Sequence, residues 1–306
     1  MYEQISKNKR LSYVLIVVMT ALVMVLGYVI GYAATGVGWF GLVIAVVIAV
    51  AMSLTSYYSG DKIALATSHA RKVTHEEAPQ LFNVVEEMAI ASGNPMPAVY
   101  IIDDSAPNAF ATGRNPEKSS IAVTQGLLDK MNRDELQGVI AHEMSHVRNY
   151  DILFATLVGV MVGAIALMAD FFLRWSIFGG SRRSNDNGGI FGVIMIVVAL
   201  VLAILAPIAA RMVQLAISRK REYLADASAV ELTRNPNGLA NALEKISGDT
   251  EQLEVANRAT AHLYIAQPIK KFEKRRRGLF DTHPPIGERI AILRAMASGG
   301  TGEAAG

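Results

Sequence analysis

The sequence GVIAHEMSHVRNYD, residues 138–151, places two histidines four positions apart with a glutamate directly after the first. If this stretch is an α-helix, His142 and His146 lie on one face and can bind the same metal ion. Glu143 is rotated by roughly 100° from His142, so it can accept a proton from water without binding the metal itself. This HExxH pattern is typical of zinc hydrolases, in which zinc makes water acidic enough to attack a carbonyl near neutral pH.

The residues before the motif predict the helix that it needs. Asn132 is followed three residues later by Glu135, the pattern of a capping box, which starts a helix by satisfying free backbone N–H groups. Apolar residues then recur at helical spacing beside the histidine face: Leu136, Val139, Ile140 and Val147. We therefore expect a helix that starts at Asn132 and buries this apolar stripe.

A third ligand is required because catalytic zinc has three protein ligands and one open position. A candidate lies in SRKREYLADA, residues 218–227, where Glu222 and Asp226 are four apart and share a helix face. One carboxylate can bind the metal while the other accepts a hydrogen bond from a metal-binding imidazole. The alternative is an ordinary charged helix start, in which both carboxylates pair with neighbouring basic side chains. The residues of this segment alone leave both interpretations open.

The composition indicates a membrane protein. Of the 306 residues, 52% are hydrophobic and 18% are charged, whereas soluble proteins carry about 25% charged residues. The formal net charge of +2 gives no support for nucleic-acid binding. The chain has no cysteine, so disulfides, thiolate metal sites and thiol nucleophiles are excluded, and any metal must be held by His, Asp, Glu or backbone oxygen.

Four apolar segments are long enough to cross a membrane, for which roughly 20 residues are needed: residues 11–32, 37–57, 152–169 and 190–210. The third is the one most easily explained as a buried helix of a soluble domain, because it contains several small residues. The basic residues Lys7, Lys9 and Arg10 precede the first segment, and positive charge favours the cytoplasmic side. We expect four transmembrane helices, with residues 59–151 and the chain after Arg211 in the cytoplasm.

The parts outside these segments indicate mixed α/β structure. Periodicity and β-rich composition predict the elements: a helix at 79–92, strands at 98–102 and 120–124, and helices within 218–246 that break at 235–238. The predicted fold class is a mainly α integral membrane protein whose cytoplasmic α+β domain is split by a transmembrane hairpin. The predicted boundaries are 1–58 for the amino terminus and transmembrane helices 1 and 2, 59–151 and 211–297 for the two parts of the domain, 152–210 for transmembrane helices 3 and 4, and 298–306 for a disordered tail.

The motifs occur in an order that resembles one family. HEMSH at 142–146 is followed, after two apolar segments, by EYLADASA at 222–229. Three further segments match in order: PNAFATG at 107–113, TQGLL at 124–128 and THPP at 282–285. Together, over nearly the whole chain, they resemble the HtpX group of membrane zinc metallopeptidases, which is related to the Ste24-type CAAX prenyl peptidases.

The resemblance implies a gluzincin-type zincin domain with one Zn²⁺ per chain, and it implies roles for individual residues. Glu222 would be the third zinc ligand beside His142 and His146, and Asp226 would accept a hydrogen bond from a ligating imidazole. Glu143 would be the catalytic base, and it would later deliver its proton to the leaving amine.

His283, in THPP, matches the family position whose imidazole stabilises the oxyanion, and the chemistry requires such a donor. Tyr223 is the competing donor to the oxyanion. Arg289 would orient the donor. A structural histidine is the alternative interpretation of His283. The remaining histidines have no partner at ligand spacing and are interpreted as solvated or structural: His69, His75 and His262.

A substrate groove is the expected role of NAFATG and of the strand that follows it. In related zinc peptidases an edge strand pairs with the backbone of an extended substrate. On this basis Asn108, Ala109, Phe110 and Val123 would bind substrate. The alternative for this segment is a turn that leads into a core strand.

The resemblance implies a zinc-dependent endopeptidase in the cell membrane, multi-pass and with its catalytic domain facing the cytoplasm. Its expected role is stress-related quality control, in which it hydrolyses misfolded or damaged membrane proteins and unfolded polypeptides beside the lipid bilayer. One alternative is a CAAX prenyl endopeptidase, against which four spans argue, since the Ste24-type chamber is built from more. The other is a membrane scaffold or transporter with a structural metal site, but structural zinc usually has four protein ligands. The oligomeric state stays open, a homo-oligomer included.

Overall fold

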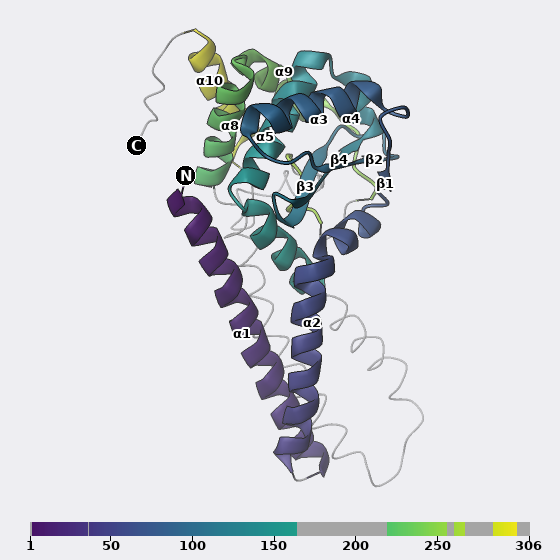
Figure 1. Ribbon diagram of the computed structural model, residues 1–306, viewed down its shortest axis with the longest axis vertical. Helices are drawn as coiled ribbons and strands as arrows, with labels where there is room; N and C mark the ends of the chain where they lie inside the picture. The colour runs from purple at the N-terminus through teal and green to yellow at the C-terminus, as the bar shows by residue number, and fades with distance from the viewer. Residues whose placement is uncertain (1, 36, 164–218, 256–259, 267–283, 299–306) are drawn as a thin grey trace.

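The computed structural model describes residues 2–35, 37–163, 219–255, 260–266 and 284–298. Two long helices, α1 (Tyr2–Thr35) and α2 (Gly38–Thr67), lie side by side and project from the rest of the described chain (Figure 1). The other labelled elements gather at one end of this hairpin, which is also the end where α1 begins and α2 finishes. The described residues therefore form a helical hairpin and an α+β body.

The hairpin carries two segments that are long and apolar enough to cross a membrane, Ile5–Val25 and Gly38–Thr67. Only 17% of the most apolar stretch of α2 is buried, whereas the core helix of a soluble protein would be buried on all sides. Large apolar side chains are exposed along both helices, with Val17 66% exposed and Val47 64% exposed. Continuous apolar surface of this kind marks a membrane or protein contact.

The described residues cover the predicted topology only in part. α2 continues as a helix to Thr67, past the predicted boundary at residue 58, so the end of the apolar segment is not the end of the helix. A helix at Asp151–Gly163 begins one residue before the predicted third span. The rest of that span, the fourth span at 190–210 and nearly all of the predicted tail lie outside the described residues.

The body contains a four-stranded sheet in the order β1-β2-β4-β3. β2 (Ala98–Ile102) and β4 (Lys118–Thr124) are parallel neighbours at its centre, and they confirm the two predicted strands, with β4 starting two residues earlier. β1 (Arg71–Lys72) and β3 (Ala109–Asn115) are the edges, antiparallel to β2 and β4 respectively. The prediction missed β3 as a strand because its Asn, Thr and Gly residues are typical of a turn; pairing with β4 makes it extended.

The helix that carries HExxH is α5 (Arg133–Arg148), and it begins as its sequence predicts. The Asn132 side chain accepts a hydrogen bond from the backbone N–H of Glu135 at 3.0 Å, and the Asn132 N–H donates to Glu135 Oε2 at 2.8 Å. This capping box satisfies two of the free N–H groups at the helix start. The Lys245 ammonium lies 2.6 Å from the same carboxylate and ties the start of α5 to another helix.

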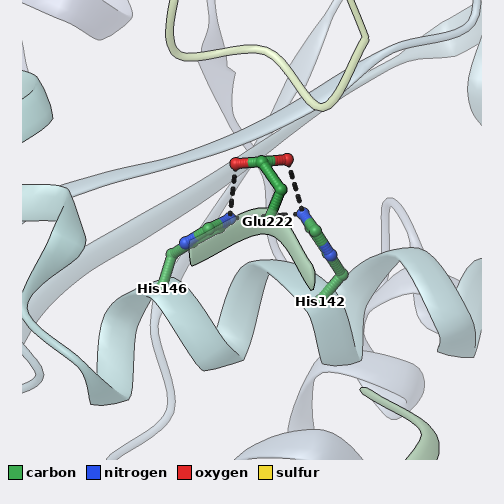
Figure 2. A group of neighbouring side chains, drawn as sticks. All are labelled: His142, His146 and Glu222. Carbon is green, nitrogen blue, oxygen red and sulfur yellow. Dashed lines mark hydrogen bonds and ion pairs between the residues drawn. The ribbon is translucent and has the colours of Figure 1, made fainter. Parts of the chain in front are cut away.

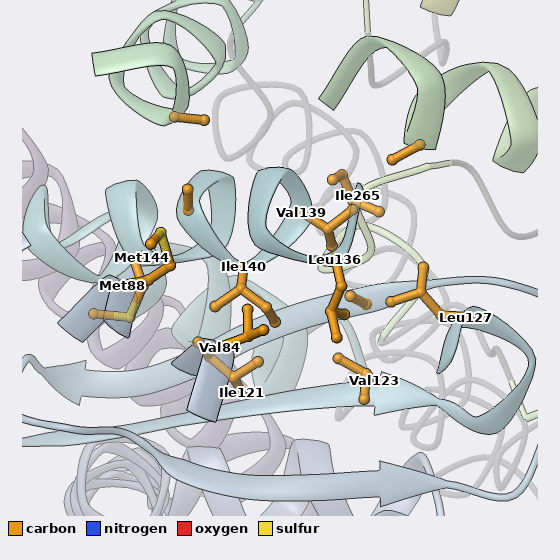
Figure 3. Close-up of a cluster of buried hydrophobic side chains, with 14 of the residues drawn as sticks. Val84, Met88, Ile121, Val123, Leu127, Leu136, Val139, Ile140, Met144 and Ile265 are labelled. Atoms are coloured by element: carbon orange, nitrogen blue, oxygen red, sulfur yellow. The ribbon is translucent and has the colours of Figure 1, made fainter. Parts of the chain in front are cut away.

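α5 lies in the middle of the body, between the sheet and further helices. The packing partners of α5 are α3 (Pro79–Ser92), α8 (Arg219–Thr233) and α9 (Pro236–Gly248), while α10 (Ile286–Ala297) packs on α9 and α4 (Gln125–Lys130) follows β4. Figure 3 shows Leu136 and Ile140 of α5 pointing toward side chains of the sheet and α3. The predicted apolar stripe of α5 is confirmed, since its members are at most 1% exposed. The predicted break at 235–238 is also confirmed, with Asn235 capping α9.

α9 approaches α5 so closely at Gly138 that an added Cβ would lie 2.6 Å from the backbone N of Leu239. Gly138→Ala should therefore force the two helices apart and destabilise the fold by about 1–3 kcal/mol, as in other overpacked cores. The measurement is the midpoint of thermal unfolding in detergent. Gly248→Ala, at the end of α9, is the matched control because nothing lies within 4 Å of its added Cβ. Equal midpoints for the two variants would contradict the close packing.

Candidate metal centre

Two helices bring together three side chains that could hold a metal ion. His142 and His146 lie on one side of α5 and point toward Glu222 of α8 (Figure 2). The two Nε2 atoms are 3.2 Å apart, and they lie 3.7 Å (His142) and 3.6 Å (His146) from the nearest oxygen of Glu222. The three side chains therefore converge on one point.

The geometry of this group fits a zinc ion. Zinc binds nitrogen and oxygen at about 2.0–2.2 Å, and tetrahedral geometry then separates neighbouring ligand atoms by about 3.3 Å. The two Nε2 atoms are 3.2 Å apart, and each faces its own oxygen of Glu222, His146 facing Oε1 at 3.6 Å and His142 facing Oε2 at 3.7 Å. With one ligand atom from each residue, the three atoms lie within 4.8 Å of one another. Two imidazoles and one carboxylate also form the ligand set of several catalytic zinc sites, which leave the fourth position open.

A carboxylate and a guanidinium lie behind His142. His142 Nδ1 is 3.0 Å from Asp226 Oδ1, and a carboxylate can only accept, so Nδ1 carries the proton and the Nε2 lone pair faces the centre. Arg289 donates to both oxygens of Asp226, at 2.8 and 2.7 Å. It is fully buried, and its Nη1 lies 3.5 Å from Glu222. The structure thus places Asp226 directly behind His142, and Arg289 beside both Asp226 and Glu222.

His146 has a carboxylate behind it as well, at a residue that was not predicted to belong to the site. His146 Nδ1 lies 3.0 Å from Asp151 Oδ2. Asp151 is the last residue of the stretch GVIAHEMSHVRNYD, but its spacing from His146 does not match helical periodicity. The only signal in the sequence was its nearness to the motif.

Burial and neighbouring charges set the protonation of the centre. Burial lowers the pKa of His142, which favours the neutral imidazole that binds metal. Burial raises the pKa of the Glu143 carboxyl to about 7. Burial alone would lower the pKa of His146, but the hydrogen bond to Asp151 and the charge of Glu222 outweigh it and raise the pKa to about 9. The site therefore holds a proton that metal binding at Nε2 of His146 would release.

A cavity opens beside these residues, with a volume of ≈ 460 Å³ that includes space open to solvent. Ala111 of β3, the residues of the metal centre and the segment 262–265 line it. His262 is 6% exposed, and its Nε2 lies 2.8 Å from the carbonyl oxygen of Ala155. Of the two predicted roles for His262, solvated or structural, the structure supports the structural one, because the segment folds over the cavity and buries this side chain.

The residues predicted to bind substrate lie in two different settings. The carbonyl oxygen of Ala109 accepts a hydrogen bond from Ile265 N–H at 2.9 Å, and Asn108 Nδ2 donates to Ala266 O at 3.1 Å. The chain's own segment thus pairs with this part of β3. Phe110 and Val123 are fully buried, and neither lines the cavity. The structure therefore gives their side chains no access to a substrate there.

Of the two candidate oxyanion donors, His283 and Tyr223, the structure describes only Tyr223. His283 lies outside the described residues. The hydroxyl of Tyr223 donates to Glu288 Oε2 at 2.9 Å, and Tyr223 does not line the cavity. Its side chain is therefore already engaged away from the metal centre.

Known proteins resemble this chain over most of its length. The sequence model of peptidase family M48 matches residues 75–297. A protein named Protease HtpX homolog from Listeria monocytogenes serotype 4a (strain HCC23) is 48% identical over 304 residues, which are 97% of this chain and 100% of the relative. The protein of the same name from Ligilactobacillus salivarius (strain UCC118) is 44% identical over 297 residues, with the same coverage of both chains.

The crystal structure of S. mikatae Ste24p is among the solved structures that resemble this chain, with a TM-score of 0.48 and 19% sequence identity. The aligned region covers 96% of this chain and 66% of that one, so this chain spans about two thirds of the length of Ste24p. The match to the family model over most of the chain, together with relatives aligned from end to end, shows that this protein belongs to peptidase family M48 and is a membrane metallopeptidase.

Proposed function

We propose that the protein is a zinc endopeptidase in which His142, His146 and Glu222 hold one zinc ion. The observation that carries this proposal is that one ligand atom from each residue lies within 4.8 Å of the other two, with the two Nε2 atoms 3.2 Å apart. Neighbouring ligand atoms around tetrahedral zinc are separated by about 3.3 Å. When bound, zinc supplies a Lewis acid that polarises the peptide carbonyl and makes water nucleophilic near neutral pH. The remaining work of the reaction falls to the protein's own side chains.

Glu143 acts as the general base. It lines the cavity and is 2% exposed, and the neighbouring backbone of Ala111 favours the charged form of its carboxyl. Its pKa of about 7 suits a group that takes a proton from the attacking water and returns it to the leaving amine.

His283 donates a hydrogen bond to the oxyanion that develops on the substrate carbonyl. Support comes from Arg289, six residues later in the chain, which reaches the metal centre through Asp226 and Glu222. Tyr223 is the weaker candidate because its hydroxyl already donates to Glu288. A donor at this point stabilises charge that exists only in the transition state.

An extended polypeptide lies along the edge of β3 at Ala111, the one residue of that strand that lines the cavity. The outer edge of β3 offers backbone groups for pairing, as in other cases of strand addition. Asn108 and Ala109 form hydrogen bonds with Ala266 and Ile265, at the end of the segment that covers the cavity. They thus shape one end of the site in which the substrate would lie. The substrate contact falls on the backbone of β3, whereas Phe110 and Val123 support it from the core.

The substrates are misfolded or damaged membrane proteins. Ile152 and Ala155 line the cavity, and both belong to the helix Asp151–Gly163, which begins the predicted third span. The cavity is therefore partly built from an apolar helix, and a chain that emerges from the bilayer would meet it first. We further propose four transmembrane helices with the peptidase domain on the cytoplasmic side, in keeping with Lys7, Lys9 and Arg10 before the first span.

Glu143→Gln should keep zinc bound but lower kcat for an unfolded substrate such as β-casein by about 10²–10⁴-fold, the usual contribution of a general base. The measurements are metal content by atomic absorption and cleavage by purified protein in detergent. His142→Ala is the matched control one residue away, and it should lose both zinc and activity because a ligand is gone. Full activity of Glu143→Gln, or stoichiometric zinc in His142→Ala, would contradict the assigned roles.

Single-cysteine labelling should reveal the orientation, since the natural chain has no cysteine. A membrane-impermeant maleimide added to spheroplasts should modify Val37→Cys, at the connection between α1 and α2. It should modify Ile90→Cys on α3, a position that is 76% exposed, only after the membrane is permeabilised. The reverse pattern would place the peptidase domain outside the cell and contradict the proposed topology.

A further inference from the structure

A group of buried polar side chains joins α1 to the metal centre. Asn8, Asp151 and Arg221 come from α1, the helix Asp151–Gly163 and α8, and they are 2%, 7% and 7% exposed. Asn8 Nδ2 donates to Asp151 Oδ1 at 2.6 Å, and Arg221 Nη1 donates to the same oxygen at 3.3 Å. Arg221 Nη1 also lies 3.3 Å from Asn8 Oδ1 and donates to it. The three side chains therefore close a ring of hydrogen bonds.

The other oxygen of Asp151 faces the metal centre. Oδ2 lies 3.0 Å from His146 Nδ1, so Asp151 uses one oxygen toward the proposed ligand and the other toward Asn8 and Arg221. A buried carboxylate is costly unless it is paired and hydrogen-bonded. Asn8 and Arg221 offset that cost and leave the carboxylate a single orientation.

The chain has to bend to bring Asp151 back to His146. Residues five apart on a continuous α-helix are rotated by roughly 140°, which would point Asp151 away. Instead α5 ends at Arg148, and Tyr150 has a φ of 59°, a left-handed conformation that residues other than glycine seldom adopt. The next helix then starts at Asp151 and directs the carboxylate at His146.

α1 holds this turn from outside. Asn8 Nδ2 donates to the carbonyl oxygen of Asn149 at 2.9 Å, and Lys9 Nζ lies 4.1 Å from the centroid of the Tyr150 ring, a cation–π contact. Further along α1, Leu15 and Met19 pack on the helix Asp151–Gly163 in one apolar cluster. The position of α1 and the conformation of the turn are thus tied together.

We propose that Asp151 is a positioning residue for His146 and that α1, through Asn8, holds Asp151 in place. This inference rests on the proposed zinc site. A carboxylate behind a metal-binding imidazole fixes the ring and makes it a stronger ligand. Asp226 already has this place behind His142, so each histidine has a carboxylate of its own. α1 is then part of the metal-site scaffold in addition to a membrane segment.

The first test compares Asp151→Ala with Asp151→Asn in the full chain, purified in detergent. Loss of such a partner typically costs about 10–100-fold in metal affinity, so Asp151→Ala should bind zinc that much more weakly. Asp151→Asn should lose less, because its amide oxygen still accepts from His146 but carries no charge. The readout is the zinc dissociation constant, from competition with a fluorescent chelator. Parent-like affinity in Asp151→Ala would overturn the role of Asp151.

The second test concerns α1 and compares Asn8→Ala with Ser12→Ala. Ser12 is the matched control, since it lies one turn further along α1, is equally buried at 2% and donates to the backbone oxygen of Asn8. Asn8→Ala should weaken zinc several-fold, less than the ~10-fold or more expected for Asp151→Ala, because Arg221 still holds the carboxylate. Ser12→Ala should bind zinc as the parent does. Equal affinities in the two variants would overturn the part assigned to α1.

Thermal unfolding of the metal-free variants separates positioning from general stability. If Asn8→Ala and Asp151→Ala unfold at the same midpoint as Ser12→Ala, any difference in zinc affinity does not come from general stability. The proposal requires that both variants then bind zinc more weakly than Ser12→Ala does. A parent protein that binds no zinc would overturn the proposed zinc site and this inference with it. Tight zinc binding by the parent together with unchanged affinity in Asp151→Ala would overturn only the inference drawn from Asp151.

Discussion

The four-residue spacing of His142 and His146 on α5 is the constraint on which the rest of the body depends. Two imidazoles one turn apart converge on a metal only while the helix keeps its rotation and a third ligand arrives from elsewhere. Packing supplies both conditions: α5 is covered by the sheet and α3 on one side and by α8 and α9 on another. α8 carries Glu222, so the contact that buries α5 also brings in the proposed third ligand.

Burying so many polar groups in one place requires that they satisfy one another. Each histidine directs Nε2 to the centre and Nδ1 to an aspartate, His142 to Asp226 and His146 to Asp151. Arg289 holds the first aspartate with two hydrogen bonds. Removing any member would leave a buried charge without its partner, which is costly in a low-dielectric interior. The centre is therefore a connected network rather than three independent ligands.

The same network explains why a peptidase domain and membrane-length helices occur in one chain. The helix Asp151–Gly163 begins three residues after α5 ends, lines the cavity with Ile152 and Ala155, and packs against α1. The apolar helices thus form part of the cavity wall and part of its support. A soluble peptidase would have to build the same wall from its own core.

Local interactions explain what the sequence by itself determined. The capping box at Asn132, the helical spacing of HExxH, the strands β2 and β4 and the break before α9 each depend on periodicity or on contacts within about four residues. Those features are visible in the order of residues, and the structure agrees with them. Metal chemistry was equally local, because two of its three proposed ligands share one helical turn.

Only the tertiary structure decided how these elements meet. It distinguished Glu222, which faces both Nε2 atoms, from Asp226, which lies behind His142, a choice that the residues alone left open. It also made an edge strand of β3 and a cavity wall of the segment 262–265. Asn8 and Asp151 are separated by 143 positions and touch only because α1 packs beside the turn after α5. Periodicity describes one element at a time, whereas such contacts depend on how several elements pack.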